Sequence, residues 1–220
     1  MKEVIFFDRR RDTRGKIAVF ALISIMFLSV TRSALACKGS QVLYEDNFST
    51  LDPDWGEKSS NLSVNNGKFI IQPEVNKGYS VINQGSIFED MDFCVKITLA
   101  KTEDLSGTSQ GFLFWAKSYD EFYYLYVIDG KFSVARWVGG RWLYPVPSRE
   151  NAAIKKGIAE SNQLRVVTKG NQATVYINDT EVVTFKGQPP QGGSFIGMRG
   201  ESPSNSQAVW EFSDLKVTKS

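Results

Sequence analysis

The chain of 220 residues contains no histidine and only two cysteines. The absence of histidine excludes catalytic triads with an imidazole base and metal sites with an imidazole ligand. Two cysteines alone cannot complete a four-ligand structural zinc site. Any catalysis by this chain must therefore depend on carboxylates or on Tyr, Lys or Ser side chains.

The chain also lacks a strong excess of charge of either sign. Of its 26 Lys/Arg and 24 Asp/Glu residues, seven and three lie in the first 36 positions, which leaves 19 basic and 21 acidic residues afterwards. A domain that binds nucleic acid usually presents a strongly basic face. We therefore expect no nucleic-acid partner. Hydrophobic residues make up 42% of the chain, which is enough to build a core.

The first 36 residues have the order of a secretory signal peptide. Residues 1–16 are polar and basic, 17–30 form an uncharged apolar run, and Ala34 and Ala36 are small residues before a cleavage site. A helix of about 14 residues is roughly 21 Å long, shorter than the bilayer core of about 30 Å. This favours a cleaved leader over a retained anchor. We expect cleavage after Ala36, a periplasmic or secreted domain over 37–220, and no membrane span in it.

Both cysteines, Cys37 and Cys94, belong to the expected mature chain. Export leads to an oxidising compartment, so we predict a disulfide that ties the mature N-terminus to a strand at 93–99. The alternative is a lipid anchor on Cys37 with a buried free Cys94. This alternative is less favoured because Leu35 stands one place from the position that lipoprotein signals prefer.

The mature chain reads as a succession of strands with period-2 alternation, bounded by Asn, Asp and Gly turns. About 11 to 13 short strands are expected. They include segments at 42–48, 68–72, 93–99, 111–116, 122–128, 131–138, 141–144, 164–168, 172–177, 181–185, 194–199 and 210–217. The one helix-like segment is 149–158. Without crossover helices, these strands predict an all-β, two-sheet antiparallel jelly-roll sandwich with one short helix at most.

Several short motifs are typical of one superfamily. They are Tyr44-Glu45-Asp46-Asn47-Phe48, Trp55, Val64-Asn65-Asn66-Gly67-Lys68-Phe69, Gly111-Phe112-Leu113-Phe114-Trp115-Ala116, Tyr119-Asp120-Glu121-Phe122-Tyr123-Tyr124, Gly139-Gly140-Arg141-Trp142, Val175-Tyr176-Ile177-Asn178-Asp179 and Trp210-Glu211-Phe212-Ser213-Asp214-Leu215-Lys216-Val217. Over 43–217 the chain resembles the concanavalin A-like, laminin G-like jelly-roll superfamily. More closely, it resembles small exported bacterial members of the 3-keto-disaccharide hydrolase-like domain family. The fold alone does not give the function, because this superfold hosts lectins, binding modules and glycosidases.

The resemblance does not extend to a catalytic carboxylate pair. Retaining glycosidases of this fold carry two glutamates and an aspartate on one strand, whereas the segment 89–92 here has no second glutamate. The keto-disaccharide hydrolase-like relatives carry a Gly-Tyr-Glu-x-Gln strand, and 123–127 here lacks that glutamate. We therefore expect a non-catalytic domain that binds carbohydrate through exposed aromatic rings and arginines. The first alternative is a glycoside hydrolase-like enzyme acting on a 3-keto disaccharide or another modified sugar, with Asp120 or Glu121 as acid or base. The second is an envelope domain that binds protein through an edge strand.

Exposed aromatic rings and arginines are the side chains with which proteins stack and hydrogen-bond sugars. The candidates gather around two tight hairpins: Trp115, Tyr119, Asp120, Tyr124, Arg136, Trp137, Arg141, Trp142 and Tyr144. In the strand 131–138, Arg136 and Trp137 point to opposite faces, and we expect the arginine to avoid the core. The alternative is that the aromatics are core packing and the arginines are solvated.

The resemblance also implies a structural Ca²⁺ where the first and last strands lie side by side. Calcium requires six to eight oxygen ligands, which must come from separate strands. Glu45 and Asp214 are the candidate ligands, with a carbonyl from the turn 65–67. Asp46 is the alternative to Glu45, since the two point to opposite faces and only one can be the ligand. The alternative is that these are ordinary solvated acids. No other cofactor is expected.

Overall fold

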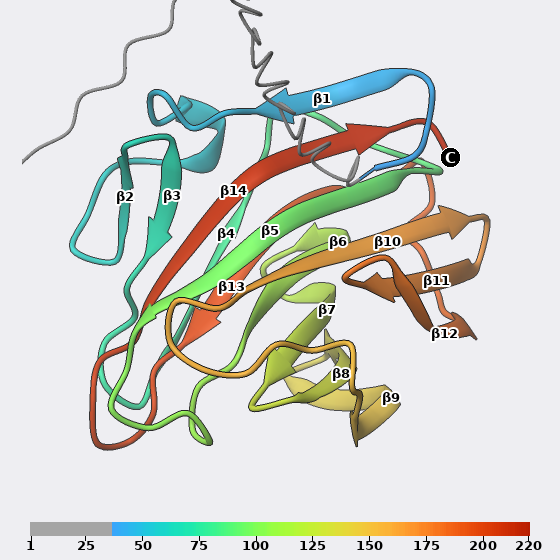
Figure 1. Cartoon of the computed structure of the whole chain (residues 1–220). Coiled ribbons are helices and arrows are strands. Elements are labelled where there is room, and N and C mark those ends of the chain that lie inside the picture. Colours follow the sequence, from blue (N-terminus) through green and yellow to red (C-terminus); the bar gives the residue numbers. More distant parts are fainter. Residues whose placement is uncertain (1–36) are drawn as a thin grey trace, which may run out of the picture. The chain divides into compact units, whose positions relative to one another are not determined.

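The computed structural model describes residues 37–220, and the predicted signal peptide and its cleavage site lie outside the described residues. The larger sheet contains β12 (Thr180–Lys186), β11 (Gln172–Ile177), β10 (Ser161–Lys169), β5 (Asp92–Lys101), β14 (Val209–Thr218), β3 (Lys68–Ile71) and β2 (Leu62–Asn65), with β1 (Val42–Asp46) paired to β14. The smaller sheet contains β4 (Gly78–Ile82), β13 (Phe195–Glu201), β6 (Gln110–Ser118), β7 (Glu121–Ile128), β8 (Lys131–Val138) and β9 (Arg141–Glu150). In Figure 1, β14, β5 and β10 lie side by side in one layer, and β6 to β9 follow one another in the other. The predicted all-β sandwich is confirmed.

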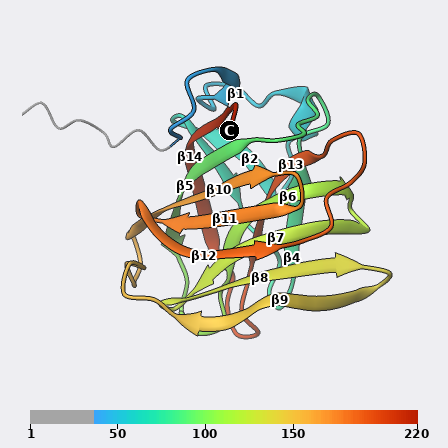
Figure 2. The ribbon, with the colours of Figure 1, turned by 90° about the vertical axis from the view of Figure 1, so that its right-hand side faces the viewer.

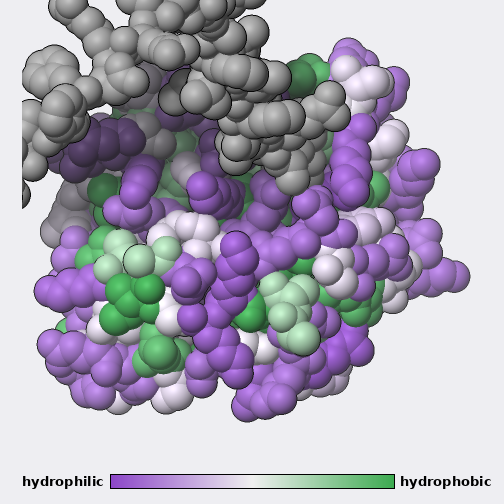
Figure 3. Space-filling view, in the orientation of Figure 1, coloured by the Kyte–Doolittle hydropathy of each residue, from purple (hydrophilic) through white to green (hydrophobic). Residues whose placement is uncertain are grey.

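The core lies between the two sheets and follows from the alternation of each strand. On β5, Phe93, Val95 and Ile97 are fully buried, whereas Lys96 between them is exposed. Trp55 of the 3₁₀ turn packs against Phe69 with ring centroids 5.3 Å apart, so aromatic packing attaches this turn to the core. The face turned to the viewer in Figure 3 is mainly hydrophilic, with hydrophobic groups in small separate areas.

The expected helix at 149–158 does not form. The first two residues end β9, and the rest is a loop whose backbone is held by asparagine side chains. The amide of Lys155 donates to Oδ1 of Asn162, whose Nδ2 donates to the Lys155 carbonyl, each at 2.9 Å. Nδ2 of Asn178 donates to the carbonyl of Ala153 at 2.6 Å. These bonds replace helical ones. Within residues 37–220 the one helix is the 3₁₀ turn η1 (Pro53–Trp55), and no helix is long and apolar enough to cross a bilayer.

Two glycine-containing turns fix the order of β7, β8 and β9. Asp129 and Gly130 both have positive φ angles (40° and 79°), as do Gly139 and Gly140 (58° and 73°). Two consecutive positive φ angles are typical of type I′ hairpins, which Asp-Gly and Gly-Gly sequences favour. Figure 2 shows β8 and β9 side by side at the edge of the smaller sheet. The register of these hairpins positions the candidate site described below.

The predicted disulfide between Cys37 and Cys94 is confirmed, with Cα atoms 5.6 Å apart. Cys94 points outward from β5, so the bridge lies on the outer side of the larger sheet. A sulfur atom in a disulfide cannot also carry a thioether-linked lipid. The structure therefore argues against the lipid anchor at Cys37, the alternative that the sequence left open.

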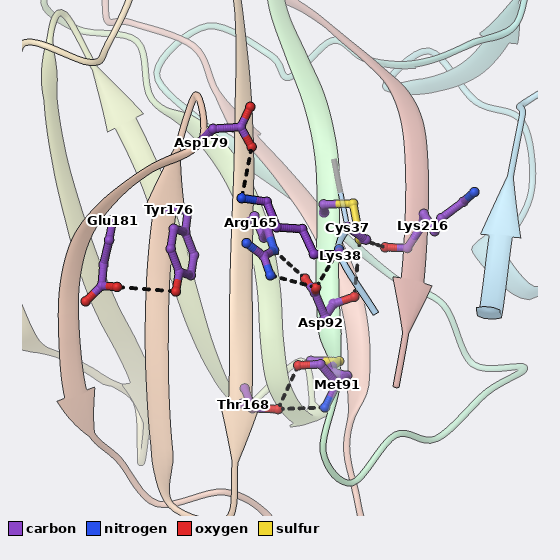
Figure 4. Close-up of polar contacts among 11 residues, drawn as sticks. Cys37, Lys38, Met91, Asp92, Arg165, Thr168, Tyr176, Asp179, Glu181 and Lys216 are labelled. Carbon is purple, nitrogen blue, oxygen red and sulfur yellow. Dashed lines mark hydrogen bonds and ion pairs between the residues drawn. A yellow bond between two sulfur atoms is a disulfide. The ribbon is translucent and has the colours of Figure 1, made fainter. Parts of the chain in front are cut away.

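A buried ion pair lies beside the disulfide (Figure 4). The guanidinium of Arg165 donates to both oxygens of Asp92, at 2.6 and 2.8 Å, and the backbone amide of Lys38 donates to Asp92 Oδ2 at 2.8 Å. Asp92 and Arg165 are only 2% and 8% exposed. The guanidinium also stacks 4.5 Å above the ring of Tyr176. The disulfide and the hydrogen bond from Lys38 to Asp92 thus both attach the N-terminal segment to the larger sheet.

Candidate functional site

The outward face of the smaller sheet carries a second hydrophobic cluster, separate from the core. Alternation along β7 directs Tyr123 and Leu125 into the core and Tyr124 and Tyr126 outward. The cluster consists of Ile82, Leu113, Ala116, Phe122 and Tyr124, with Tyr126, Trp137, Trp142 and Phe195 packed against it. An outward sheet face is normally polar. A face rich in aromatic side chains is therefore a candidate ligand platform.

An ion pair from β13 lies on this face. Nε and NH2 of Arg199 donate to Glu201 Oε1 at 3.0 and 2.8 Å, and NH1 donates to Ser80 Oγ at 2.7 Å. The second carboxylate oxygen of Glu201 accepts a hydrogen bond from Ser109 Oγ at 2.7 Å. The side chains are 17% and 35% exposed, so the pair is sheltered but open to solvent. We call these two residues the Arg199–Glu201 pair.

Aromatic rings surround this pair. The guanidinium carbon of Arg199 lies 5.7 Å from the ring centroids of both Tyr124 and Trp142, which is a cation–π distance. Tyr124 stacks on Tyr126 at 4.9 Å, and Trp142 packs against Trp137 at 5.1 Å. We define the aromatic face as Tyr124, Tyr126, Trp137, Trp142 and Tyr144 together with the Arg199–Glu201 pair. It combines apolar rings, charged hydrogen-bonding groups and hydroxyls in one surface.

Two tyrosines of this face, Tyr124 and Tyr126, are held in their neutral form. Burial raises the pKa of Tyr124 well above its usual value of 10.0, and the nearby carboxylate of Glu201 raises it further. Burial also raises the pKa of Tyr126. A phenol with a raised pKa keeps its proton at neutral pH. Both hydroxyl groups can therefore take part in hydrogen bonds at neutral pH, but neither acts as a base.

The structure brings four of the sequence-predicted candidates together on the aromatic face. Tyr124 is buried beneath it, Trp137 and Trp142 are partly buried, and Tyr144 is 54% exposed. Trp142 lies directly opposite Trp137 in the β8–β9 ladder. Tyr144 lies close enough to Tyr126 to contribute to the raised pKa of that side chain. The density of aromatics around the hairpins indicated this grouping correctly.

Trp115 lies elsewhere, in the core. It is 1% exposed, sits at an irregular point of β6 with a φ of 47°, and packs against Tyr123 at 5.2 Å. The irregularity turns its side chain inward, toward the core cluster. Trp115 is therefore not available to a ligand on the surface.

The expected orientation of Arg136 is wrong. It shares the inward side of β8 with Phe132 and Val134, and its side chain is only 13% exposed. NH2 of Arg136 donates to Glu121 at 2.9 Å, NH1 donates to Gln188, and the guanidinium lies 5.3 Å from the Tyr123 ring centroid. These contacts compensate for the burial of the charge. Trp137 is the residue that faces outward.

The remaining candidates lie at hairpin turns. Tyr119 and Asp120 are exposed in the β6–β7 turn, and the Tyr119 hydroxyl accepts a hydrogen bond from the Ile82 amide at 3.2 Å. Arg141 is exposed at the start of β9. The candidate acids Asp120 and Glu121 are thus at a turn, where Glu121 is paired with Arg136 rather than with a second carboxylate.

Sequence reasoning missed Ser80, Ser109, Arg199 and Glu201. The signal available was the alternation in 195–201, which places Arg199 and Glu201 on one side of a strand. Arg199 lies opposite Ser80 in the ladder between β13 and β4. Ser109 comes within hydrogen-bonding distance of Glu201 because β6, which begins at the next residue, pairs with the other edge of β13. These residues come from three distant parts of the chain, so pairing alone brings them together.

The candidate calcium ligands each have a lysine partner. Glu45 Oε2 lies 3.0 Å from Lys216 Nζ, and Asp214 Oδ2 lies 3.8 Å from Lys96 Nζ. Asp46 turns inward and accepts a hydrogen bond from Nε1 of Trp55 at 2.9 Å. In the part of the chain that the structure describes, no three Asp, Glu, His or Cys side chains are grouped to hold a metal ion.

The calcium hypothesis stays a prediction that a melting experiment tests. If Glu45 and Asp214 bind calcium, the melting temperature should be several degrees higher in calcium than in EDTA, because a ligand that binds only the native state stabilises it. The difference should disappear in Asp214→Ala. Asp179→Ala is the matched control, since Asp179 is also an exposed aspartate near a lysine. Equal melting temperatures of the unsubstituted protein in calcium and in EDTA would contradict the calcium hypothesis.

Solved structures with the same fold include carbohydrate-active proteins. Carbohydrate-binding module CBM66 from Bacillus subtilis is 12% identical, with a TM-score of 0.55 over 67% of this chain and 86% of that one. The β-glucanase of Bacillus licheniformis is 10% identical, with a TM-score of 0.59 over 80% and 97%. LamAcat from Zobellia galactanivorans is 12% identical, with a TM-score of 0.58 over 82% and 98%. At these identities the likeness shows the fold alone.

The sequence itself matches a family model over nearly all of the described sandwich. No curated protein sequence matches significantly. The model of the 3-keto-alpha-glucoside-1,2-lyase-like domain matches residues 42–218, from the first strand to the last. The resemblance drawn from the motifs is thereby confirmed, and the chain belongs to the family of 3-keto-alpha-glucoside-1,2-lyase-like domains.

Proposed function

We propose that this domain is exported and binds carbohydrate on the aromatic face without transforming it. The observation that carries the proposal is the Arg199–Glu201 pair held against Tyr124 and Trp142. The faces of pyranose rings are apolar and stack on aromatic rings, while their hydroxyls need charged hydrogen-bonding partners. The aromatic face provides both. The names of its structural neighbours, a carbohydrate-binding module and a β-glucanase, support a ligand of this class.

Binding without catalysis is favoured by the carboxylates of the site. A retaining glycosidase needs two carboxyl groups about 5 Å apart, one of which acts as an acid. The described contacts bring one carboxylate, that of Glu201, to the aromatic face, and Arg199 holds it in an ion pair. Asp120 and Glu121 lie at the β6–β7 turn. The disulfide favours an oxidising compartment and so supports export.

The second candidate function is cleavage of a 3-keto-glycoside, which the family match alone favours. Turnover of 3-keto-glycosides by the purified protein would support it. Loss of that turnover in Asp120→Asn or Glu121→Gln would assign it to the turn. Loss in Glu201→Gln would assign it to the aromatic face.

Binding is tested first on a glycan array and then by tryptophan fluorescence or calorimetric titration. We expect Trp142→Ala and Arg199→Met each to weaken binding about tenfold or more, because a stacked ring or a charged hydrogen bond contributes about 1.5–3 kcal/mol and each 1.4 kcal/mol is tenfold. Tyr176→Ala is the matched control, since it removes a partly exposed aromatic from the larger sheet.

Three results would contradict or redirect the proposal. Absence of binding to any glycan by the folded protein would contradict it. Equal affinity of Trp142→Ala and the unsubstituted protein would place the ligand elsewhere. Capture of an envelope protein but no polysaccharide, in parallel pull-downs, would favour the protein-binding alternative.

A further inference from the structure

The Arg199–Glu201 pair has no net charge, although it presents charged groups. The guanidinium is a monocation and the carboxylate a monoanion, and Glu201 Oε1 accepts from two nitrogens of the same guanidinium at 3.0 and 2.8 Å. Arg141, which precedes Trp142 on β9, points to the opposite side of the strand from Trp142. A ligand beside the pair therefore meets strong hydrogen-bonding groups whose two charges cancel each other.

The pair retains unused hydrogen-bonding positions of both kinds. A guanidinium has five N–H donors. Contacts with Glu201 and Ser80 engage three of them, one each on Nε, NH1 and NH2, so one donor on NH1 and one on NH2 remain. Oε2 of Glu201 accepts one bond, from Ser109, and keeps further acceptor capacity. Two donors beside an acceptor match adjacent hydroxyl groups, each of which accepts and donates.

A carboxylate ligand would fit this arrangement less well. It could accept from the two free donors, but its charge would lie next to Glu201, and like charges at short range repel. The partial shelter of the pair weakens solvent screening of that repulsion. A neutral sugar avoids the repulsion and uses the Glu201 acceptor, which a carboxylate ligand cannot.

We propose that Glu201 is a specificity-determining residue that makes the aromatic face select neutral sugars with adjacent hydroxyls over uronic acids. This inference rests on the proposed carbohydrate binding and adds the charge class of the ligand. Arg199 positions the hydroxyls, and Glu201 both neutralises Arg199 and repels acidic rings.

The test measures affinities for paired oligosaccharides that differ in one carboxylate per ring. Suitable pairs are oligoglucose with oligoglucuronate and oligogalactose with oligogalacturonate. We expect the unsubstituted protein to prefer the neutral member of the pair that it binds. In Glu201→Gln the preference should shift toward the uronate by about tenfold, because Arg199 becomes an unneutralised cation while the side-chain shape is kept.

Salt dependence provides a second readout. Uronate binding by Glu201→Gln should weaken as sodium chloride rises from about 50 to 500 mM, whereas neutral-sugar binding by the unsubstituted protein should change little. Glu211→Gln is the matched control, because Glu211 is also a partly buried glutamate paired with a basic residue but lies on β14 in the larger sheet. It should leave the ratio of affinities unchanged.

The possible outcomes separate this inference from the proposed function. If the folded protein binds neither member of any pair, the proposed function fails and the inference fails with it. If the unsubstituted protein binds uronates as tightly as neutral sugars, the inference is wrong while carbohydrate binding stands. An unchanged affinity ratio in Glu201→Gln would also overturn the inference.

Discussion

Replacing both Cys37 and Cys94 with alanine is expected to lower the free energy of unfolding by about 4 kcal/mol. The bridge joins residues separated by 57 positions. Closing a loop of this length restricts the unfolded chain, and the chain-entropy relation gives about 4 kcal/mol, with 2–5 kcal/mol typical for natural disulfides. Urea denaturation of the mature protein, monitored by tryptophan fluorescence, measures the change.

Reduction of the unsubstituted protein provides the control for this experiment. It should produce a loss of stability similar to that of the double alanine variant, because both remove the same bond, and the reductant should not affect the variant. In the reduced protein, limited proteolysis should cut the N-terminal segment first. Without the bridge, non-covalent contacts such as the hydrogen bond from Lys38 to Asp92 hold this segment in place, and they are weaker than the covalent bond. A loss below about 1 kcal/mol would mean that the bridge does not restrict the unfolded chain as the entropic relation requires.

Asp92→Ala is expected to lower the free energy of unfolding by about 3–5 kcal/mol. The substitution leaves the guanidinium of Arg165 buried without its carboxylate, and an uncompensated buried charge has a cost of that order. It also removes the acceptor of the Lys38 amide. Denaturation at neutral pH measures the loss, and near-ultraviolet circular dichroism checks that the variant still folds.

The double variant Asp92→Ala, Arg165→Met separates the cost of the stranded charge from the value of the pair. Methionine keeps the apolar stem over Tyr176 and removes the charge. We expect the double variant to be more stable than Asp92→Ala alone, because replacing both charges of a buried pair is often nearly neutral. Strictly additive losses would show that Asp92 and Arg165 act independently, contrary to their two short hydrogen bonds.

The strands were predictable because each carries its own local signal. In β5 the buried side chains of Phe93, Val95 and Ile97 alternate with others such as Lys96 and Thr98. Asp129-Gly130 and Gly139-Gly140 are residues that tolerate the positive φ angles of tight hairpins. The helix expected at 149–158 does not form because residues outside this segment offer its backbone other hydrogen bonds. Asn162 from β10 and Asn178 from the turn between β11 and β12 hydrogen-bond its backbone. A window of ten residues contains no information about them.

The candidate site was predictable only in part for a similar reason. Trp137, Trp142 and Tyr144 lie on one hairpin, so their grouping followed from short-range pairing. The side of β8 on which Arg136 lies could not be predicted in this way. An arginine without partners avoids the core, whereas Arg136 forms an ion pair with Glu121 and a cation–π contact with Tyr123 at the edge of the core. Trp115 was misplaced because a single irregularity in β6 reverses the side on which a residue lies.

The sequence by itself determined the all-β class, the approximate strand positions, the hairpins, the disulfide partners and the family. The class, strands and hairpins depend on periodicity and turn residues, the disulfide partners on the presence of only two cysteines, and the family on the resemblance of the short motifs. The tertiary structure alone decided that Arg199 and Glu201 meet Ser80, Ser109 and Trp142. Their pairing requires β13 to lie between β4 and β6, and the order of strands in a sheet is set by packing of the whole core rather than by any local segment.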